Sequence, residues 1–233
     1  MEHEQQPQKK GLDTSTAIII AGILIALAIL GTNSSLKDKI KVWLKPTPTR
    51  IAFALGVSVN DYKACVAEGA SKPLIAKQEE EARIAGAQGT PFNIIVTKTG
   101  KTLVIPGALT YDKLKPLLDE ILANPESTRI PWTTDAKFVY QPVNTTDHIR
   151  GAADPAITII EYSDLDCPYC KLFHGVLEQA MKDYGTQIAW VYRHSPIDSL
   201  HPDARNKAIG AECVAKLKGE EAFWKFVDKV MAN

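Results

Sequence analysis

The N-terminal part of the chain holds one long uncharged apolar run. Residues 14–31 carry no charged side chain, and as a helix they would span roughly 27 Å at about 1.5 Å per residue, which just crosses the core of a bilayer. We therefore expect a transmembrane anchor at 14–31, after a short tail at 1–13. A cleaved signal peptide is the alternative, but the run is long for such a segment and no A-x-A-like site follows it.

A lysine-rich segment, residues 32–49, follows the apolar run. Its apolar residues recur at helical spacing between the lysines, which predicts either a helix lying on the membrane surface or a plain helical stalk. The lysine count would place the following residues in the cytoplasm by the positive-inside rule. Pro46 and Pro48 are expected to end any helix here and to open a short stiff linker.

Residues 50–124 show helical periodicity, then two β-rich runs, then helical periodicity again. Ser58 is expected to begin a helix that Gly69 ends, and a charged helix is expected at 73–85. The runs 92–97 and 102–105 flank a short turn, a pattern typical of a hairpin. An amphipathic helix should follow, with apolar positions Leu114, Leu117, Leu118, Ile121 and Leu122.

The pattern changes again after residue 124. Residues 125–137 contain two prolines and no apolar periodicity, so they are predicted to be a linker. An edge strand is expected at 138–140, a buried strand at 156–162 and another strand at 187–192, with a helix between the last two. This order predicts a β-α-β unit with a parallel crossover. Two more helices are expected at 203–217 and 220–231.

Composition narrows the class of protein. The 233 residues are 45% hydrophobic and 23% charged, which is close to the globular average and excludes a multi-span membrane protein or a wholly disordered chain. The 27 basic and 27 acidic residues give a net charge of zero. This balance lacks the basic footprint that nucleic-acid binding usually needs, so no nucleic-acid partner is expected.

The Cys167-x-x-Cys170 motif carries the candidate chemistry. Cys167 follows the buried strand and lies in the first turn of the next helix, where unsatisfied N–H groups and the helix dipole favour a thiolate. Cys170, one turn further, is placed to attack a mixed disulfide and release the partner. A soft-metal site formed by Cys167, Cys170 and His174 is the alternative, although a second Cys-x-x-Cys or a close histidine pair is missing.

Four segments together resemble the DsbA-like thiol:disulfide oxidoreductases, thioredoxin-fold proteins with a helical insertion. The segments read EYSDLDCPYCKLFH at 161–174, WVYRHSP at 190–196, AEC at 211–213 and GTP at 89–91. The resemblance covers 50–124 and 138–233. It implies an α/β, thioredoxin-like fold with an inserted helical subdomain, and an enzyme that needs no metal or other cofactor.

The resemblance also assigns roles to residues around the cysteine pair. It implies that Cys167 is the nucleophile and Cys170 the resolving thiol. Glu161 matches a buried acid that helps proton transfer as Cys170 ionises; an exposed strand-end carboxylate is the alternative. Thr90 and Pro91, with a cis peptide bond, would form the loop that faces the substrate. The dipeptide between the cysteines, Pro168-Tyr169, would also face the substrate and tune the redox potential.

The remaining cysteines and the histidines complete the candidate residues. The resemblance places Cys65 and Cys213 together in the helical insertion, which implies a structural disulfide; two buried free thiols are the alternative. His174, His194 and His201 are expected to be surface or core-edge residues rather than catalytic groups.

The order of the two halves departs from the family. Here the Gly-Thr-Pro half, 50–124, precedes the Cys-x-x-Cys half, 138–233, and neither half has enough strands for a core of its own. Circular permutation within one chain, exchange of halves between two chains, and a truncated second copy are the three explanations. Permutation is the one we expect.

These inferences together predict a membrane-anchored enzyme whose catalytic domain is extracytoplasmic. Disulfide exchange suits an oxidising compartment, which outweighs the lysine count. The expected partners are client proteins with thiols or disulfides and a redox-recycling partner, for which a membrane protein is one candidate. The rival function is a membrane-tethered module that binds or delivers a soft metal through the same cysteines.

Overall fold

The computed structural model describes residues 47–134 and 138–232. In chain order the elements are α3 (Pro48–Ala54), α4 (Val59–Glu68), α5 (Lys72–Ile84), β1 (Phe92–Thr97), β2 (Thr102–Pro106), α6 (Tyr111–Ala123), β3 (His148–Gly151), β4 (Ile157–Ser163), α7 (Pro168–Tyr184), β5 (Ile188–His194), α8 (Ala204–Lys218) and α9 (Glu220–Met231). Among these helices, none is long and apolar enough to cross a membrane. The anchor expected at 14–31 lies outside the described residues.

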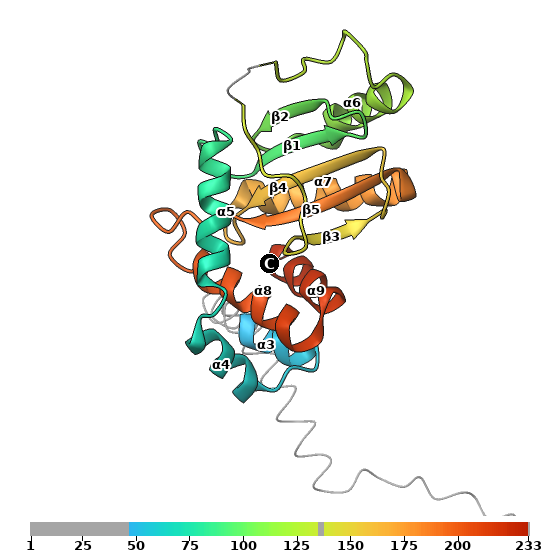
Figure 1. Cartoon of the computed structure of the whole chain (residues 1–233). Coiled ribbons are helices and arrows are strands. Elements are labelled where there is room, and N and C mark those ends of the chain that lie inside the picture. Colours follow the sequence, from blue (N-terminus) through green and yellow to red (C-terminus); the bar gives the residue numbers. More distant parts are fainter. Residues whose placement is uncertain (1–46, 135–137, 233) are drawn as a thin grey trace, which may run out of the picture. The chain divides into compact units, whose positions relative to one another are not determined.

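Five strands form one mixed sheet in the order β2-β1-β4-β5-β3 (Figure 1). The expected hairpin is confirmed, because β1 and β2 pair antiparallel. The β-α-β unit is confirmed as well, since β4 and β5 pair in parallel around the crossover helix α7. The two halves of the chain meet where β1 pairs antiparallel with β4, with Asn93 opposite Glu161. Strands from both halves therefore build one sheet.

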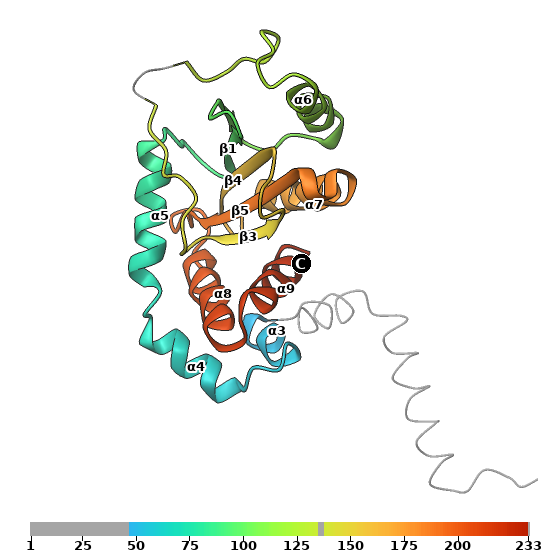
Figure 2. The same ribbon diagram turned by 45° about the vertical axis from the view of Figure 1, so that its right-hand side comes forward.

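Helices cover both faces of the sheet, with α5 on one side and α6 and α7 on the other (Figure 2). Successive side chains along a strand point to opposite faces of the sheet. Ile94 and Ile160 pack in a cluster with Ala82 of α5. Ile95 and Ile159 belong instead to the larger core, which includes Phe173 of α7 and the apolar sides of the remaining helices. Burial on both faces explains why the central strands are almost continuously apolar.

Helices α3, α4, α8 and α9 group together beside the β3 edge (Figure 2). The first of them, α3, begins at Pro48, inside the range 32–49 that was expected to be a spacer. Proline is well tolerated in the first turn of a helix, and the side chain of Thr47 caps this turn by accepting from the Arg50 backbone N–H at 3.3 Å. The expected proline-stiffened linker is therefore wrong from Thr47 onward.

The segment expected as a linker packs against the sheet along its described residues, 125–134. Ile130 is buried in the main core, and Trp132 packs against it. The backbone N–H of Thr133 donates to the Thr102 carbonyl at 2.8 Å, and the Val104 N–H donates to the Thr133 hydroxyl at 3.0 Å. These bonds cover the outer edge of β2, which would otherwise be an open sheet edge.

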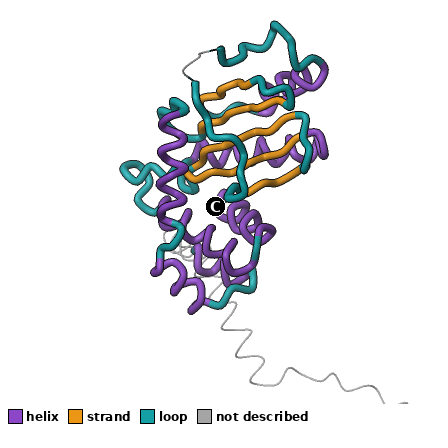
Figure 3. The backbone as a smooth tube through the Cα atoms, in the orientation of Figure 1, coloured by secondary structure: helices purple, strands orange, loops and turns teal. Residues whose placement is uncertain are grey.

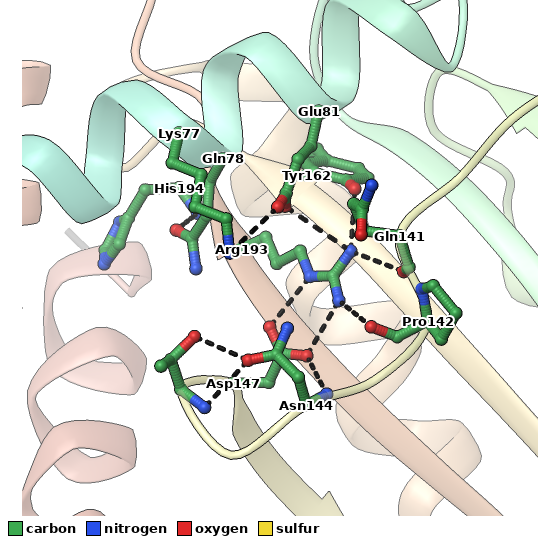
Figure 4. A network of polar contacts seen from close by, with 11 residues as sticks. Lys77, Gln78, Glu81, Gln141, Pro142, Asn144, Asp147, Tyr162, Arg193 and His194 are labelled. Atoms are coloured by element: carbon green, nitrogen blue, oxygen red, sulfur yellow. Dashed lines mark hydrogen bonds and ion pairs between the residues drawn. The ribbon is translucent and has the colours of Figure 1, made fainter.

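The edge strand expected at 138–140 is not formed. The edge strand next to β5 is β3. Residues 138–147 run as a loop (Figure 3), and the buried side chain of Arg193 in β5 holds them (Figure 4). Its guanidinium donates to the carbonyls of Gln141 at 2.9 Å and Pro142 at 3.0 Å. It also donates twice to the Asp147 carboxylate, at 2.8 and 2.7 Å. The loop is therefore bound to β5 by one side chain rather than by strand pairing.

Candidate active site

A tight turn connects β4 to the cysteine-bearing helix. The fully buried Asp164 carboxylate accepts from the backbone N–H groups of Asp166 at 2.7 Å and Cys167 at 3.2 Å. Cys167 then stands at the N-cap of α7, and Pro168 supplies the first helical position. Because the turn is fixed from inside, the nucleophile expected from the sequence is held directly at the positive end of the helix.

The Cys167 thiol is the acidic member of the pair. Its sulfur lies 3.4 Å from the Thr90 carbonyl oxygen, and the side chain is only 4% exposed. Hydrogen bonds from the Cys170 thiol and from the Cys170 backbone amide lower the pKa of Cys167 to about 5, against the effect of burial. A thiol with that pKa is almost wholly thiolate at neutral pH, which is the reactive form.

Cys170 has the opposite character. Its side chain is fully buried, and both cysteines of the motif are free thiols in this structure. Burial, the hydrogen bond to Cys167 and the charge of Glu161 raise the pKa of the Cys170 thiol well above its ordinary value. The Asp164 backbone N–H donates to its sulfur at 3.4 Å. The pair therefore consists of an ionised, nearly buried sulfur on Cys167 and a protonated, fully buried sulfur on Cys170.

Glu161 lies in the interior of the sheet. Its carboxyl group is fully buried and accepts from the Ser163 hydroxyl at 2.8 Å and from the Trp190 indole N–H at 3.0 Å. Burial raises the pKa of Glu161 to about 7. The alternative of an exposed strand-end carboxylate is wrong. A carboxyl group that titrates near neutral pH beside a buried thiol is suited to take up and return a proton.

The Thr90–Pro91 peptide bond is cis and lies in the loop between α5 and β1, next to the cysteine pair. Two shallow grooves flank this loop. One is lined by Pro91, Phe92, Pro106 and Gly107 together with the glycine-rich loop itself. The other lies between α5 and the loop after β5, and Thr90 lines both. The side-chain amide of Asn93 donates to the Ile105 carbonyl at 3.3 Å and to the Gly107 carbonyl at 3.0 Å, which fixes the open end of the hairpin.

Three residues close to the cysteines in the sequence have exposed apolar side chains. Pro168 is exposed, Tyr169 is 63% exposed and Leu172 is 68% exposed. A group of exposed apolar side chains, unlike a single one, is a candidate contact surface. Leu172 was not singled out from the sequence.

The other two cysteines form a disulfide. Cys65 of α4 is bonded to Cys213 of α8, and both side chains are buried within the helical group. The link joins residues separated by 148 positions. The disulfide joins α4 to α8, whereas Cys167 and Cys170 lie at the start of α7. It therefore links two helices and is separate from the reacting sulfurs.

The histidines are more buried than the sequence indicated. His174 and His194 are 3% and 1% exposed, and neither is a surface residue. His201 Nδ1 lies 2.8 Å from the Asp164 carboxylate, which accepts, and so helps to hold the turn before Cys167. Nothing in the sequence spacing indicated that contact, because Asp164 and His201 belong to different loops.

The cysteines do not take part in a metal-ligand cluster within the described residues. Among these, the one group that could gather around an ion consists of His174, Glu178 and Asp228. This differs from the set weighed from the sequence, in which His174 was joined with Cys167 and Cys170. The thiols instead hydrogen-bond to each other and to the backbone.

Comparison with known proteins supports the fold. Residues 143–233 match the sequence model of a family described as thioredoxin. The domain is thioredoxin-like, with a mixed sheet and covering helices. A domain of this kind indicates thiol–disulfide chemistry in general terms.

Similar sequences occur in much longer proteins. The Na(+)/H(+) antiporter NhaA 3 of Salinispora tropica is 36% identical over 87 residues, 37% of this chain and 13% of that protein. The Na(+)/H(+) antiporter NhaA 1 of Mycobacterium sp. (strain KMS) is 28% identical over 158 residues, 60% of this chain and 26% of that protein. The chain thus spans a small part of the length of these relatives. The antiport activity in their names is stated of those proteins.

Proposed function

We propose that this protein is a thiol:disulfide oxidoreductase of the DsbA-like kind, which exchanges disulfides with client proteins through Cys167 and Cys170. The observation that carries the proposal is the asymmetry of the two sulfurs. Cys167 has a pKa of about 5 and is 4% exposed, whereas Cys170 is fully buried and its pKa is raised. Attack by one thiol and resolution by the other require this difference.

The reaction balances as a two-electron exchange. In the oxidising direction a client thiolate attacks Sγ of Cys167 in the Cys167–Cys170 disulfide, and the S–S electron pair leaves on Cys170, which takes a proton. A second client thiolate then attacks the client sulfur of the mixed disulfide, forms the client disulfide and releases Cys167 as a thiolate. The reverse sequence reduces a client disulfide, and it begins with attack by Cys167.

The surroundings of Cys167 suit an extended peptide. The Thr90 backbone lies beside the reacting sulfur, and Thr90 and Pro91 line the adjoining grooves. Pro168 and Tyr169 present exposed apolar surface on the other side of the sulfur. We infer that a client chain lies along the Thr90–Pro91 loop with apolar side chains against Tyr169.

The order of the halves is best explained by circular permutation. β1 from the first half pairs with β4 from the second, and the connecting chain contacts the sheet along its described residues 130–133. Exchange of halves between two chains would use the same contacts, and the experiment that separates the two cases is given in the Discussion.

We place the enzyme outside the cytoplasm, anchored by residues 14–31. The Cys65–Cys213 disulfide supports an oxidising compartment, where such bonds persist. Thiol exchange with client proteins also belongs there, with a recycling partner that restores the redox state of the pair.

Activity assays on a reducible and a refoldable client test the proposal. The chain should either catalyse the reduction of insulin by dithiothreitol or speed the oxidative refolding of a reduced disulfide protein, and Cys167→Ser should abolish that activity. Strong thiol-dependent metal binding with neither activity would overturn the proposal in favour of a metal-delivery module.

A further inference from the structure

Disulfide exchange at the proposed pair requires one proton to reach or leave Cys170 in each half-reaction. Cys170 is fully buried, and Glu161, whose charge acts on it, is fully buried as well. The two groups that hydrogen-bond to Glu161 are Ser163 and Trp190, which are also buried. Neither a serine hydroxyl nor an indole N–H exchanges protons readily at neutral pH, so the carboxyl group needs another route to solvent.

His174 stands between this interior and the surface. It lies one helical turn after Cys170 on α7 and is 3% exposed. Its ring meets the Trp190 ring edge-on, with centroids 4.8 Å apart, and Trp190 is the residue that donates to Glu161. Among the charged groups around Glu161, His174 acts most strongly on its carboxyl.

The two ring nitrogens of His174 have different surroundings. Nε2 lies 2.9 Å from Oδ1 of Asp228 on α9, whose side chain is 30% exposed. Nδ1 is buried and has no hydrogen-bond partner within the described structure. An imidazole can accept a proton on one nitrogen and release one from the other, which makes a histidine in this position a natural proton carrier.

Four charged or titratable groups face His174 from the elements packed around it. They are Glu161 on β4, Asp228 on α9, Arg150 on β3, and Glu178 one turn further along α7. Arg150 donates to the second Asp228 oxygen at 2.7 Å and lies over the Trp190 and Trp224 rings. Its positive charge opposes binding of a metal dication at His174, Glu178 and Asp228. Proton transfer fits this cluster better than metal binding.

We propose that His174 carries the proton between the buried Glu161 carboxyl and solvent at Asp228. When a client thiolate breaks the Cys167–Cys170 bond, Glu161 gives its proton to the leaving Cys170 sulfur, and His174 returns a proton to Glu161 from the Asp228 side. When Cys170 resolves a mixed disulfide, the same groups move the proton outward. The proposal rests on the proposed function, because only exchange at Cys170 creates this proton demand.

Reaction of the reduced chain with dithiobis(nitrobenzoate) separates the two sulfurs. Cys167 attacks the reagent and releases one thionitrobenzoate anion in a first phase. Cys170 then loses its proton, attacks Cys167 in the mixed disulfide and releases a second anion, which is recorded by absorbance in a stopped-flow instrument. The second phase reports the proton transfer. A wild-type chain that released no second anion would contradict the proposed function itself.

His174→Gln should leave the first phase within about twofold of wild type and slow the second by at least about tenfold near pH 7, the lower range for loss of a general acid–base group. Asp228→Asn, at a partly exposed position, should slow the second phase less and decides the case if His174→Gln fails to fold. Lys182→Gln, at an exposed position two turns further along the same helix, is the matched control and should change neither phase.

The pH profile distinguishes proton transfer from a structural role. In wild type the second-phase rate should rise through the titration of Glu161, and in His174→Gln that rise should flatten. An unchanged second phase in folded His174→Gln would overturn the proposal. Equal slowing of both phases would overturn it too, because that result indicates a disturbed helix α7 rather than a lost proton carrier.

Discussion

The Thr90 carbonyl oxygen lies 3.4 Å from the sulfur of Cys167, although 77 residues separate the two positions. The contact joins the loop before β1, in the first half of the domain, to the start of α7, in the second half. It places a backbone acceptor and the cis Pro91 beside the reacting sulfur. The arrangement of the site therefore depends on both halves being assembled.

A thiol introduced at position 90 tests this assembly. We expect Thr90→Cys, in a Cys170→Ser background, to form an intrachain disulfide with Cys167, because the Thr90 backbone contacts that sulfur. Mass spectrometry of non-reduced peptides at high dilution detects the link. Thr99→Cys, in the exposed turn at the other end of β1, is the control and should not link.

The concentration dependence of the link separates the two assemblies. A link between chains that appears only as concentration rises would favour exchange of halves over closure within one chain. If the introduced thiol linked to Cys167 under neither condition, the proximity of the two halves would be contradicted.

The ionisation of the two thiols can be followed by alkylation. Cys167 should react with iodoacetamide with a rate that is half-maximal near pH 5, because hydrogen bonds from Cys170 stabilise its thiolate. Cys170→Ser should accumulate mixed disulfides with clients, since the attacking thiol remains without its resolving partner. If Cys170 proved to be the more acidic and accessible thiol, the two roles would be reversed.

The sequence was sufficient for most elements because local signals decided them. The caps of α4 are confirmed: Ser58 accepts from the Asp61 N–H at 3.3 Å, and Gly69 ends the helix with a φ of 64°. The side-chain periodicity also placed Cys167 at the start of α7. Signals of this kind involve residues a few positions apart, so one chain without relatives suffices to find them.

The missed features depend on long-range polar contacts. Residues 138–140 alternate like a strand, yet the neighbouring backbone bonds to the Arg193 guanidinium more than 50 residues away in the chain. The Asp164–His201 contact and the Asp228–His174 contact likewise join separate elements. Composition gives no sign of which acid will meet which base, because both types are common on surfaces.

The Cys65–Cys213 disulfide should contribute to stability through the unfolded chain. Closing a loop of 148 residues stabilises by at most about 5 kcal/mol in the chain-entropy model. Replacing both cysteines by alanine should therefore lower the urea midpoint while leaving the alkylation of Cys167 unchanged. Recovery of unlinked Cys65 and Cys213 peptides from the oxidised protein would contradict the bond.

Stability should vary with pH through a buried histidine–glutamate pair. His148 Nε2 lies 3.1 Å from Glu212, and His148 Nδ1 lies 2.7 Å from Glu220. Burial alone would lower the pKa of His148, but the hydrogen bonds to both glutamates outweigh it and raise the pKa to about 9. Against the burial effect, hydrogen bonds from His148 and His194 lower the pKa of Glu212 to about 2.

The signs of these shifts define the window of highest stability. Because the pKa of His148 is raised, its ion pairs stabilise the folded state fully at pH values below 6.5, its pKa in the unfolded chain. This stabilisation is lost as pH rises through about 9. Because the pKa of Glu212 is lowered, its ionised form stabilises the folded state fully at pH values above 4.5, its pKa in the unfolded chain. This stabilisation is lost as pH falls through about 2. Urea midpoints should therefore be highest between about pH 4.5 and 6.5, as far as this pair determines them.

His148→Gln tests the alkaline side of the window. It should cost about 3 kcal/mol at pH 6, as expected for breaking a buried ion pair, and much less at pH 10. Glu220→Gln, at a half-exposed side chain, keeps the buried partner and should cost far less. The same loss at both pH values in His148→Gln would show that packing against Phe223, not charge, explains it.

The buried Arg193–Asp147 pair should be essential for holding the loop 138–147 on the sheet (Figure 4). Both side chains are almost fully buried, and the two carboxylate oxygens accept from Nε and Nη2 at 2.8 and 2.7 Å. Lysine cannot reproduce this two-point contact or the bonds to the Gln141 and Pro142 carbonyls. Arg193→Lys should therefore cost about 3 kcal/mol and make the loop sensitive to proteases.

The Arg83–Glu80 pair on α5 provides a control of the same geometry in solvent. Its guanidinium also contacts the carboxylate at two points, at 2.7 and 2.6 Å, but both side chains are more than half exposed. Arg83→Lys should leave the urea midpoint almost unchanged, as is usual for exposed pairs. Urea unfolding of the two variants side by side measures the difference. An equal, small loss in both would mean that 138–147 is held by its apolar contacts, with Phe138 and Tyr140 packed on the sheet, rather than by Arg193.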